Sequence, residues 1–353
     1  MKNDAYYMNK ALELAAKGLG HTHPNPPVGA VIVKNGRVIG SGYHKKAGLA
    51  HAEIEALRVC KTSPAGAVLY VTLEPCSHFG KTPPCADAII KNKLKKVVIG
   101  TRDPNPLVAG RGIKKLRRAG IETVCGVMKE EAGGLIRYFS KFITSGLPYI
   151  TLKAASTIDG RIAAKGGDSK YITSPESRTI VHLLRSINDA VLIGSGTALA
   201  DNPLLDTRLL GPGARKPVKI ILDAGDRLTG REKLFHSGRT IVFSGAAGRL
   251  KDAENITVVR NCGSDIKKIM KKTAELGLTS VLVEGGSEIF TAFIKARLAD
   301  ELLVFYSPSV FGADGIPMLG ALGIKSAAGR LKASLLSAGV AGGDLAARFK
   351  INY

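Results

Sequence analysis

Two successive series of short apolar strands and helices constrain the fold of this chain more than any other feature of its sequence. The first series opens with an amphipathic segment, 4–16, which predicts a helix that ends near Gly18. Two β-rich runs then flank Asn35-Gly36, the dipeptide most typical of a tight β-hairpin. Helices and strands alternate after this hairpin and again through the second half of the chain. This order favours sheets covered by helices, and therefore an α/β fold class.

The remaining predicted elements follow from apolar periodicity and from turn residues. In the first half, the expected helices are 51–60, 83–93 and 112–120, and the expected strands are 67–73, 95–101 and 121–127. In the second half, the expected helices are 174–186, 265–277 and 287–299, and the expected strands are 149–155, 190–196, 217–224, 240–245, 256–259, 279–286 and 301–310.

A break in the pattern separates the two series. Gly146 and Pro148 interrupt it, and a new apolar strand follows. The two halves do not resemble each other, so the sequence predicts two different α/β domains, at 1–145 and 146–353. Either half is long enough to bury a sizeable core.

Composition narrows the classes of protein to which the chain can belong. No apolar run is long enough to span a bilayer and the first residues lack a signal-peptide core, so we expect no membrane association and a cytoplasmic location. Five cysteines, an odd number, argue against a disulfide framework. The net charge of +22 favours anionic partners such as phosphorylated metabolites, nucleotide cofactors or nucleic acid. Charge alone does not separate these partners from a basic surface that has no specific role.

One group of residues points to catalytic chemistry. It combines His51 and Glu53 of "HAE" with Cys76 and Cys85 of "PCSHFGKTPPC". A catalytic zinc ion needs three protein ligands and one open position for water, and one histidine with two thiolates supplies the three. Zinc lowers the pKa of a bound water, and Glu53 is placed to move protons without ligating the metal. A His-x-Glu combined with a Pro-Cys pair is the arrangement found in zinc-dependent deaminases.

The spacing of the two cysteines leaves an alternative open. A His-x-Glu or a cysteine pair is commonly accidental when it stands alone, and many cytosolic cysteines are core residues. Cys85 follows Cys76 by nine positions instead of three. The inserted loop contains glycine and proline and can fold back, so tetrahedral geometry remains possible. The combined pattern, with a strand that leads into Cys76, predicts one Zn²⁺ per chain.

Longer stretches carry a more specific resemblance. The segments "HTHPNPPVGAVIV", "HAEIEAL" and "TLEPCSHFGKTPPCADAII" resemble the deaminase half of the bifunctional deaminase/reductases of riboflavin biosynthesis, a family with the longer cysteine spacing. The segments "TLKAASTIDGRIA", "YITSPESRTIVHLLR", "TALADNPLL" and "VEGG" resemble its reductase half. The resemblance spans nearly the whole chain. It implies a cytidine-deaminase-like N-terminal domain and a dihydrofolate-reductase-like C-terminal domain.

The resemblance also implies two reactions. The first is zinc-dependent hydrolytic deamination of 2,5-diamino-6-(5-phosphoribosylamino)pyrimidin-4-one. The second is NADPH-dependent reduction of the ribosyl side chain, which gives 5-amino-6-(5-phosphoribitylamino)uracil. The expected partners are therefore this phosphorylated pyrimidine and NADPH, and we expect a homo-oligomer.

Substrate residues of the deaminase half are carried over by the same resemblance. They are Asn25, His44, His78 and Lys81, which fall where the family holds the base and the phosphate. An amide suits the edge of a base and a lysine suits a phosphate. The alternative for each is an ordinary loop residue exposed to solvent.

Ligand residues of the reductase half are implied in the same way. Substrate positions are Ser169, Arg185, Leu205, Arg208 and Glu284, and cofactor positions are Ala155, Tyr171, Thr197, Asp201 and the stretch from Gly286 onward. Tyr171 departs from a tryptophan that some members carry there. Lys153 is a further candidate near the reacting centre, with an ordinary strand lysine as the alternative.

The strand-to-helix turn of "VEGGSEIF" supports a cofactor site on independent grounds. Gly285 and Gly286 permit close backbone approach, and free N–H groups of the helix that begins near Ser287 can hold a phosphate. Tight turns of this kind also carry glycine for packing alone. The sequence "GSGTAL" (194–199) lacks the third glycine of a dinucleotide fingerprint, so we predict no Rossmann site there.

Two other classes of protein share part of this pattern. A nucleic-acid deaminase of the tRNA adenosine type, with an accessory binding domain, shares "HAE" and the basic charge. It predicts short cysteine spacing and an aromatic-rich second half, whereas aromatic residues make up 5% of the chain and tryptophan is absent. A non-catalytic scaffold predicts that Glu53 or a metal ligand has been lost, and all four residues are present.

Overall fold

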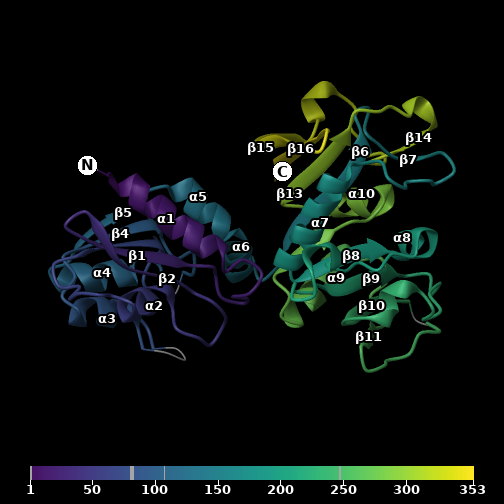
Figure 1. The fold of residues 1–353 in the computed structure, drawn as a ribbon. Coiled ribbons are helices and arrows are strands. Elements are labelled where there is room, and N and C mark those ends of the chain that lie inside the picture. The colour runs from purple at the N-terminus through teal and green to yellow at the C-terminus, as the bar shows by residue number, and fades with distance from the viewer. Residues whose placement is uncertain (1, 80–82, 107, 246–247) are drawn as a thin grey trace. The chain divides into compact units, whose positions relative to one another are not determined.

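The computed structural model describes residues 2–79, 83–106, 108–245 and 248–353 of the chain. The chain divides into two compact units, Met1–Gly146 and Leu147–Tyr353 (Figure 1). Each unit is an α/β domain built around its own sheet. No helix in these described ranges is long and apolar enough to cross a membrane.

The first unit contains a five-stranded mixed sheet in the order β2-β1-β3-β4-β5. Its strands are β1 (Gly29–Lys34), β2 (Arg37–Tyr43), β3 (Val68–Leu73), β4 (Lys96–Thr101) and β5 (Glu122–Cys125). The first two form the predicted hairpin, where Asn35 and Gly36 take the left-handed φ values of 51° and 74° that a tight turn requires. Strands β3, β4 and β5 run parallel, so their carboxyl ends lie at one edge of the sheet.

Helices cover both faces of this sheet (Figure 1). They are α1 (Asp4–Ala16), α2 (Ala52–Arg58), α3 (Cys85–Lys91), α4 (Arg111–Arg118), α5 (Lys129–Leu135) and α6 (Arg137–Ser145). Alternate strand residues divide between two cores: Val31 packs with α1 and α5, whereas Ile32 packs with α2, α3 and α4. Both faces of β1, β3 and β4 are therefore buried, as their apolar runs predict, whereas β2 and β5 at the edges are partly exposed.

The second unit contains a nine-stranded sheet in the order β11-β10-β9-β8-β12-β6-β13-β16-β15. Its strands are β6 (Tyr149–Thr157), β8 (Ala190–Gly194), β9 (Val218–Asp223), β10 (Thr240–Ser244), β11 (Ile256–Val259), β12 (Ser280–Val283), β13 (Glu301–Ser307), β15 (Lys332–Ala341) and β16 (Asp344–Asn352). Strands β15 and β16 are antiparallel additions at one edge, and the other neighbours in the sheet are parallel. A separate two-stranded ladder joins β7 (Arg161–Ala164) to β14 (Gly315–Pro317).

Helices also cover both faces of the larger sheet. They are α7 (Pro175–Ile187), α8 (Ser195–Asp201), α9 (Ile266–Glu275) and α10 (Ser287–Lys295). Met270 of α9 and Phe293 of α10 are completely buried against one face, and Val181 of α7 packs against Phe305 on the other. Helix α7 begins as predicted, because the Ser174 side chain accepts a hydrogen bond from the Ser177 N–H.

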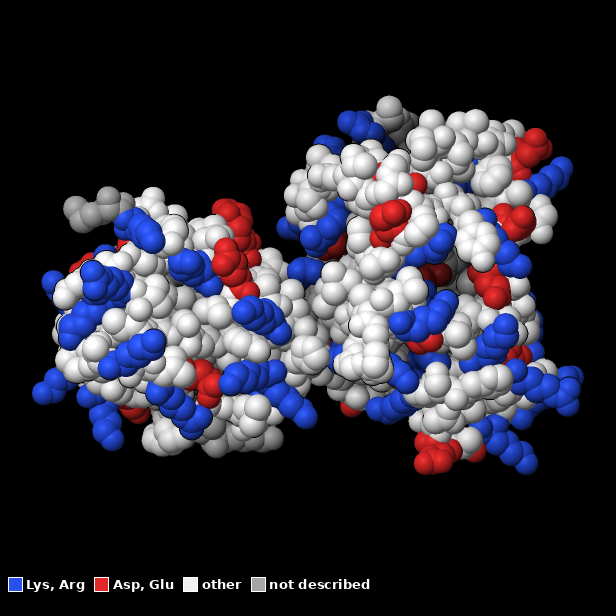
Figure 2. Space-filling view, in the orientation of Figure 1, with Lys and Arg blue, Asp and Glu red and all other residues white. Residues whose placement is uncertain are grey.

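The predicted helices and strands are present, and the structure adds elements that the sequence did not suggest. Helices α5 and α6 occupy the segment just before the break, and β15 and β16 complete the sheet at its antiparallel edge. Basic side chains are spread over the face seen in Figure 2, with acidic side chains between them, and do not form one continuous stripe. This distribution agrees with the scattered lysines and arginines of the sequence.

Candidate active sites

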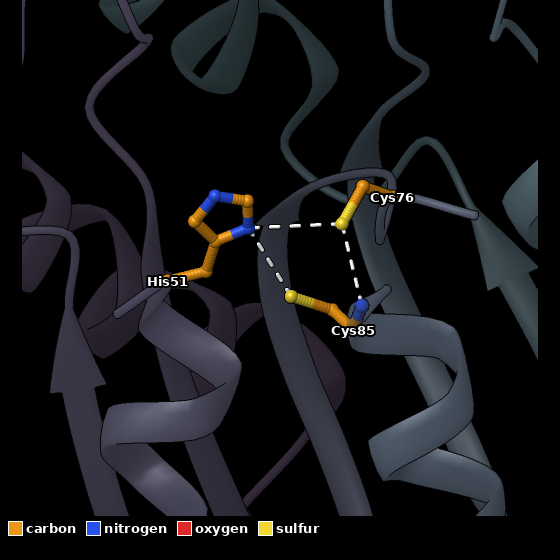
Figure 3. A group of neighbouring side chains, drawn as sticks. All are labelled: His51, Cys76 and Cys85. Atoms are coloured by element: carbon orange, nitrogen blue, oxygen red, sulfur yellow. Dashed lines mark hydrogen bonds between the residues drawn. The ribbon is translucent and has the colours of Figure 1, made fainter. Parts of the chain in front are cut away.

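Three side chains of the first unit converge on one point (Figure 3). The ligand atoms of His51, Cys76 and Cys85 all lie within 4.8 Å of one another. The Nδ1 atom of His51 is 3.2 Å from the Cys85 sulfur and 3.7 Å from the Cys76 sulfur. One nitrogen and two sulfurs at these separations form the donor set that zinc prefers, so the residues present fit the ion.

Local structure brings the two cysteines together despite their nine-residue separation. Cys76 lies in the loop after β3, and Cys85 is the first residue of α3. The Cys85 N–H donates to the Cys76 sulfur at 3.3 Å, and the Ala86 N–H donates to the Cys76 carbonyl at 3.1 Å. Cys76 therefore lies against the start of α3, where free N–H groups favour a thiolate.

The surroundings of the two thiols shift their pKa values in opposite directions. A hydrogen bond from the Cys85 thiol, and a further one from His51, lower the pKa of Cys76 to about 4. The resulting Cys76 thiolate and burial raise the pKa of Cys85. The hydrogen bond to Cys76 likewise raises the pKa of His51. This cluster holds protons that a cation would displace, which makes metal binding dependent on pH.

Glu53 lies beside this cluster in the first turn of α2 and is only 4% exposed. Burial raises the pKa of the Glu53 carboxyl to about 7, and the nearby Cys76 thiolate adds to the shift. A carboxyl group with a pKa near neutrality can both accept and donate a proton at that pH. The carboxyl group also lines a cavity of about 420 Å³, which His51 and Cys76 line as well.

The same cavity receives three of the four predicted substrate residues of this unit: Asn25, His44 and His78. The His44 ring lies between two hydrogen-bond partners, with Nδ1 3.1 Å from the Ala50 carbonyl and Nε2 3.2 Å from the Asn25 side-chain nitrogen. Nδ1 therefore carries the proton, and the Asn25 amide donates to Nε2. The fourth residue, Lys81, lies outside the described residues.

Sequence reasoning missed other residues that line this cavity. Asp103 and Asn105 follow β4 and lie in its wall, as does Glu74, which follows β3. The available signal was the position of these polar residues directly after two parallel strands. Ligands of open α/β sheets commonly bind at the carboxyl ends of the strands.

A second cavity, of about 730 Å³, lies in the second unit. It is lined by residues that follow the carboxyl ends of β8 and β12 and by residues of β6. The predicted residues that it contains are Lys153, Ala155, Ser169, Thr197, Asp201, Glu284, Gly285, Gly286 and Ser287. A Cβ atom at Gly285 would lie 2.8 Å from the Ile289 Cβ, so a glycine is needed where the turn approaches α10.

Glu284, which lines this cavity, forms an ion pair with Arg185, which does not. Arg185 of α7 donates to both carboxylate oxygens of Glu284, at 2.7 and 2.8 Å, and its third nitrogen donates to the Asp206 carbonyl at 3.1 Å. The Arg185 guanidinium holds the pKa of Glu284 low against the opposing effect of burial. Burial lowers the pKa of Lys153, which lines the cavity near this pair.

Four predicted residues of the second unit do not line this cavity: Arg185, Tyr171, Leu205 and Arg208. Tyr171 is 80% exposed, and the Arg178 guanidinium lies 5.1 Å from its ring centre. Leu205 is buried, and exposed Arg208 forms an ion pair with Asp206. Tyr171 and Leu205 both have left-handed φ values, 59° and 51°, which are unusual for bulky residues.

Comparison with known proteins bears on both units. Residues 1–101 match the family model for the cytidine and deoxycytidylate deaminase zinc-binding region, and residues 148–346 match the model for the RibD C-terminal domain. The riboflavin biosynthesis protein RibD of Aquifex aeolicus is 45% identical over 353 residues, which cover 98% of each chain. The chain belongs to the RibD family. RibD of Escherichia coli is 40% identical over 88% of this chain and 89% of its own.

Solved structures of the RibD family have the same fold. A Thermotoga maritima protein described as a diaminohydroxyphosphoribosylaminopyrimidine deaminase / 5-amino-6-(5-phosphoribosylamino)uracil reductase matches with a TM-score of 0.89 and 40% identity over 99% of both chains. One crystal form of Acinetobacter baumannii RibD matches with a TM-score of 0.89 and 36% identity over 99% of both chains.

These matches confirm the predicted family, fold class and paired activities. The chain is a bifunctional deaminase and reductase of riboflavin biosynthesis, with a cytidine-deaminase-like domain and a dihydrofolate-reductase-like domain. The deaminase domain binds zinc, and the reductase domain uses a cofactor of the nicotinamide kind. The family assignment favours this prediction over the tRNA-type deaminase.

Proposed function

We propose that the first unit deaminates 2,5-diamino-6-(5-phosphoribosylamino)pyrimidin-4-one by hydrolysis, and that the second unit then reduces its ribosyl side chain with NADPH. The observation that carries the first half is the convergence of His51, Cys76 and Cys85 beside a buried carboxyl group in a cavity. These three residues are the proposed zinc ligands. The substrate is the one that the Thermotoga maritima relative names.

Glu53 is the proposed proton carrier of the deamination. Zinc, when bound, acts as a Lewis acid that makes water nucleophilic near neutral pH. As the water oxygen bonds to the amino-bearing ring carbon, the Glu53 carboxylate accepts a proton from it. Glu53 passes this proton to the ring nitrogen. It then accepts the second proton, from the new hydroxyl group, and delivers it to the amino group, which departs as ammonia while the C–N bond breaks and the carbonyl forms. Its burial in the cavity wall beside the metal ligands suits both transfers.

Polar side chains around the three proposed zinc ligands are proposed to orient the substrate in this cavity. Asn25 and His44 form one hydrogen-bonded wall, and Asn25 retains a carbonyl oxygen that can accept from a base edge. His78 lies in the cavity wall and is proposed to lie near the ribosyl phosphate. Lys81 remains a proposed phosphate ligand on the ground of its charge alone.

The reductase cavity is the proposed NADPH site, and the turn at Gly285-Gly286 is the proposed phosphate cradle. Helix α10 begins directly after this turn, and its first N–H groups can hold a phosphate. Ala155, Thr197, Asp201 and Ser287 line the same cavity and complete the proposed cofactor set there. NADPH supplies the hydride when bound.

The substrate end of this cavity is assigned to Lys153, Ser169 and Glu284. Lys153 is proposed to deliver the proton that accompanies the hydride, because its ammonium is near Glu284 and its pKa is lowered by burial. Arg185 acts on the substrate through Glu284, since its three nitrogens are already hydrogen-bonded. Arg208 is exposed and remains the proposed phosphate ligand, and Leu205 and Tyr171 remain proposed contacts to substrate and cofactor.

The remaining parts of the proposal concern organisation. We propose that the two activities divide near residue 146, where the two units meet in sequence. A cytoplasmic location belongs to the same proposal, because both reactions act on small phosphorylated metabolites, and a homo-oligomer stays a prediction. No nucleic-acid partner is proposed.

Metal analysis tests the deaminase half directly. The purified chain should contain about one zinc per molecule, as expected for three protein ligands and an open position. Removal of the metal with a chelator should abolish ammonia release, and added zinc should restore it. A metal-free protein that deaminates at the full rate would refute the proposed site.

A further inference from the structure

Glu74 is a buried carboxylate that the proposed chemistry does not use. It is 4% exposed and lies at the carboxyl end of β3, two residues before Cys76. Three backbone N–H groups donate to it: Asp103 at 3.3 Å and Gly110 at 2.9 Å to one oxygen, and Ile113 at 3.2 Å to the other. Hydrogen bonds to a charged acceptor are stronger than neutral ones, so this is a substantial anchor.

The three donors bracket the segment that forms one wall of the deaminase cavity. Asp103 begins this segment, and Gly110 and Ile113 belong to the start of α4. Asn105 and Val108 lie between them and line the cavity together with Asp103. Glu74 therefore fixes both ends of the cavity wall and also caps the N-terminus of α4.

Described residues of the segment are also hydrogen-bonded to one another, and Glu74 adds a link from both of its ends to the end of β3. The Asn105 carbonyl accepts from the N–H groups of Val108 and Ala109, at 3.0 and 2.9 Å, and the Asp103 carboxylate accepts from the Asn105 N–H at 2.9 Å. Gly112 allows the close approach, because a Cβ there would lie 2.0 Å from the Pro75 carbonyl oxygen.

We propose that Glu74 is a positioning residue of the deaminase, which links the strand end that carries Cys76 to the wall that faces the substrate. It sets where the Asp103–Val108 side of the cavity lies relative to the metal ligands. A carboxylate suits this role because it only accepts hydrogen bonds and has room for three donors. The inference rests on the proposed deaminase function for its kinetic consequence, although the attachment itself can be measured without substrate.

Glu74→Gln tests the proposal, since the new NH₂ group replaces one acceptor with a donor that faces backbone N–H groups. If the wall adopts its native position only a tenth of the time, the KM for the pyrimidine should rise roughly tenfold. The kcat should change by less than about threefold, because the chemical groups are intact once substrate is bound. Zinc content should stay at about one per chain.

Hydrogen exchange supplies a readout that needs no substrate. In Glu74→Gln the amides of Asp103, Gly110 and Ile113 should exchange faster, while those of β1 and β3 should not change. Glu55→Gln is the matched control, because Glu55 does not line the deaminase cavity and pairs with Lys45 and Arg58. It should leave both the KM and the exchange of the wall unchanged.

Three results would overturn the inference. They are an unchanged KM with unchanged exchange, a fall in kcat with an unchanged KM, and a joint loss of zinc and global stability, which would make Glu74 merely structural. If Glu74→Gln does not fold, Glu74→Asp keeps the charge but shortens the reach, and the same KM and exchange criteria apply to it. A wild-type protein without deaminase activity would refute the proposed function instead, and the exchange experiment would still decide the role of Glu74.

Discussion

The Arg185–Glu284 pair offers the most quantitative prediction, because both side chains are almost fully buried. They are 12% and 10% exposed and form two parallel hydrogen bonds of 2.7 and 2.8 Å. Arg185→Met keeps the aliphatic volume of the side chain, but it leaves the charged Glu284 carboxylate without the Arg185 guanidinium as its partner. Breaking a buried pair in this way costs about 3–5 kcal/mol. A domain of this size loses about 2–4 °C in Tm for each kcal/mol, so the reductase transition should fall by roughly 10 °C.

A double-mutant cycle separates the pair from other effects of these substitutions. Glu284→Gln alone should also destabilise the reductase unit. The double variant, Arg185→Met with Glu284→Gln, should lose about 1.5–3 kcal/mol less free energy of unfolding than the sum of the two single losses. Calorimetry or circular dichroism on the full chain gives the Tm values. Arg208→Met is the control, because its partner Asp206 forms an exposed pair worth about 0–1 kcal/mol. If the stability losses of the two single variants simply added in the double variant, the two side chains would not be coupled. That result would refute the predicted cost of breaking the pair.

Three further substitutions test other parts of the structure. Cys85→Ser should lose most of the zinc, because a neutral hydroxyl replaces a thiolate ligand; metal analysis that found full occupancy would contradict the ligand set. Glu53→Gln should keep zinc but reduce the rate of ammonia release at least about 10²-fold. It should not change the rate at which NADPH is oxidised when the deaminated compound is supplied. Gly285→Ala should weaken NADPH binding in a direct titration, because the new Cβ would lie 2.8 Å from the Ile289 Cβ; unaltered affinity would argue against a cofactor phosphate at this turn.

The zinc cluster could be predicted because its signals are local. Glu53 is two residues after His51, and the cysteine loop closes on the first N–H group of the helix that follows. Residue type and spacing therefore carried most of the information. The same holds for the Asn35-Gly36 hairpin and for the Ser174 helix start, where local chemistry decides the backbone.

The parts that could not be predicted depend on which strands are neighbours. Asp103 and Asn105 reach the deaminase cavity because β4 pairs with β3; their position after an apolar strand indicates an end of the sheet, but not which strand is the neighbour. The resemblance places Arg185 at the substrate, but its pairing with Glu284, 99 residues away, depends on the tertiary fold and has no local signal. Strand β15 is rich in small and polar residues and is exposed along nearly its whole length, so it lacks the apolar alternation that reveals a half-buried strand.

The central claim is that one chain carries two sites that act in order, deamination first and reduction second. The most direct measurement supplies the ribosylamino-pyrimidine phosphate with and without NADPH, and follows ammonia and NADPH separately. Ammonia should be released at the same rate without NADPH, and NADPH oxidation should begin only as the deaminated compound accumulates. Ammonia release that requires NADPH, or NADPH oxidation that precedes any ammonia, would contradict the central claim.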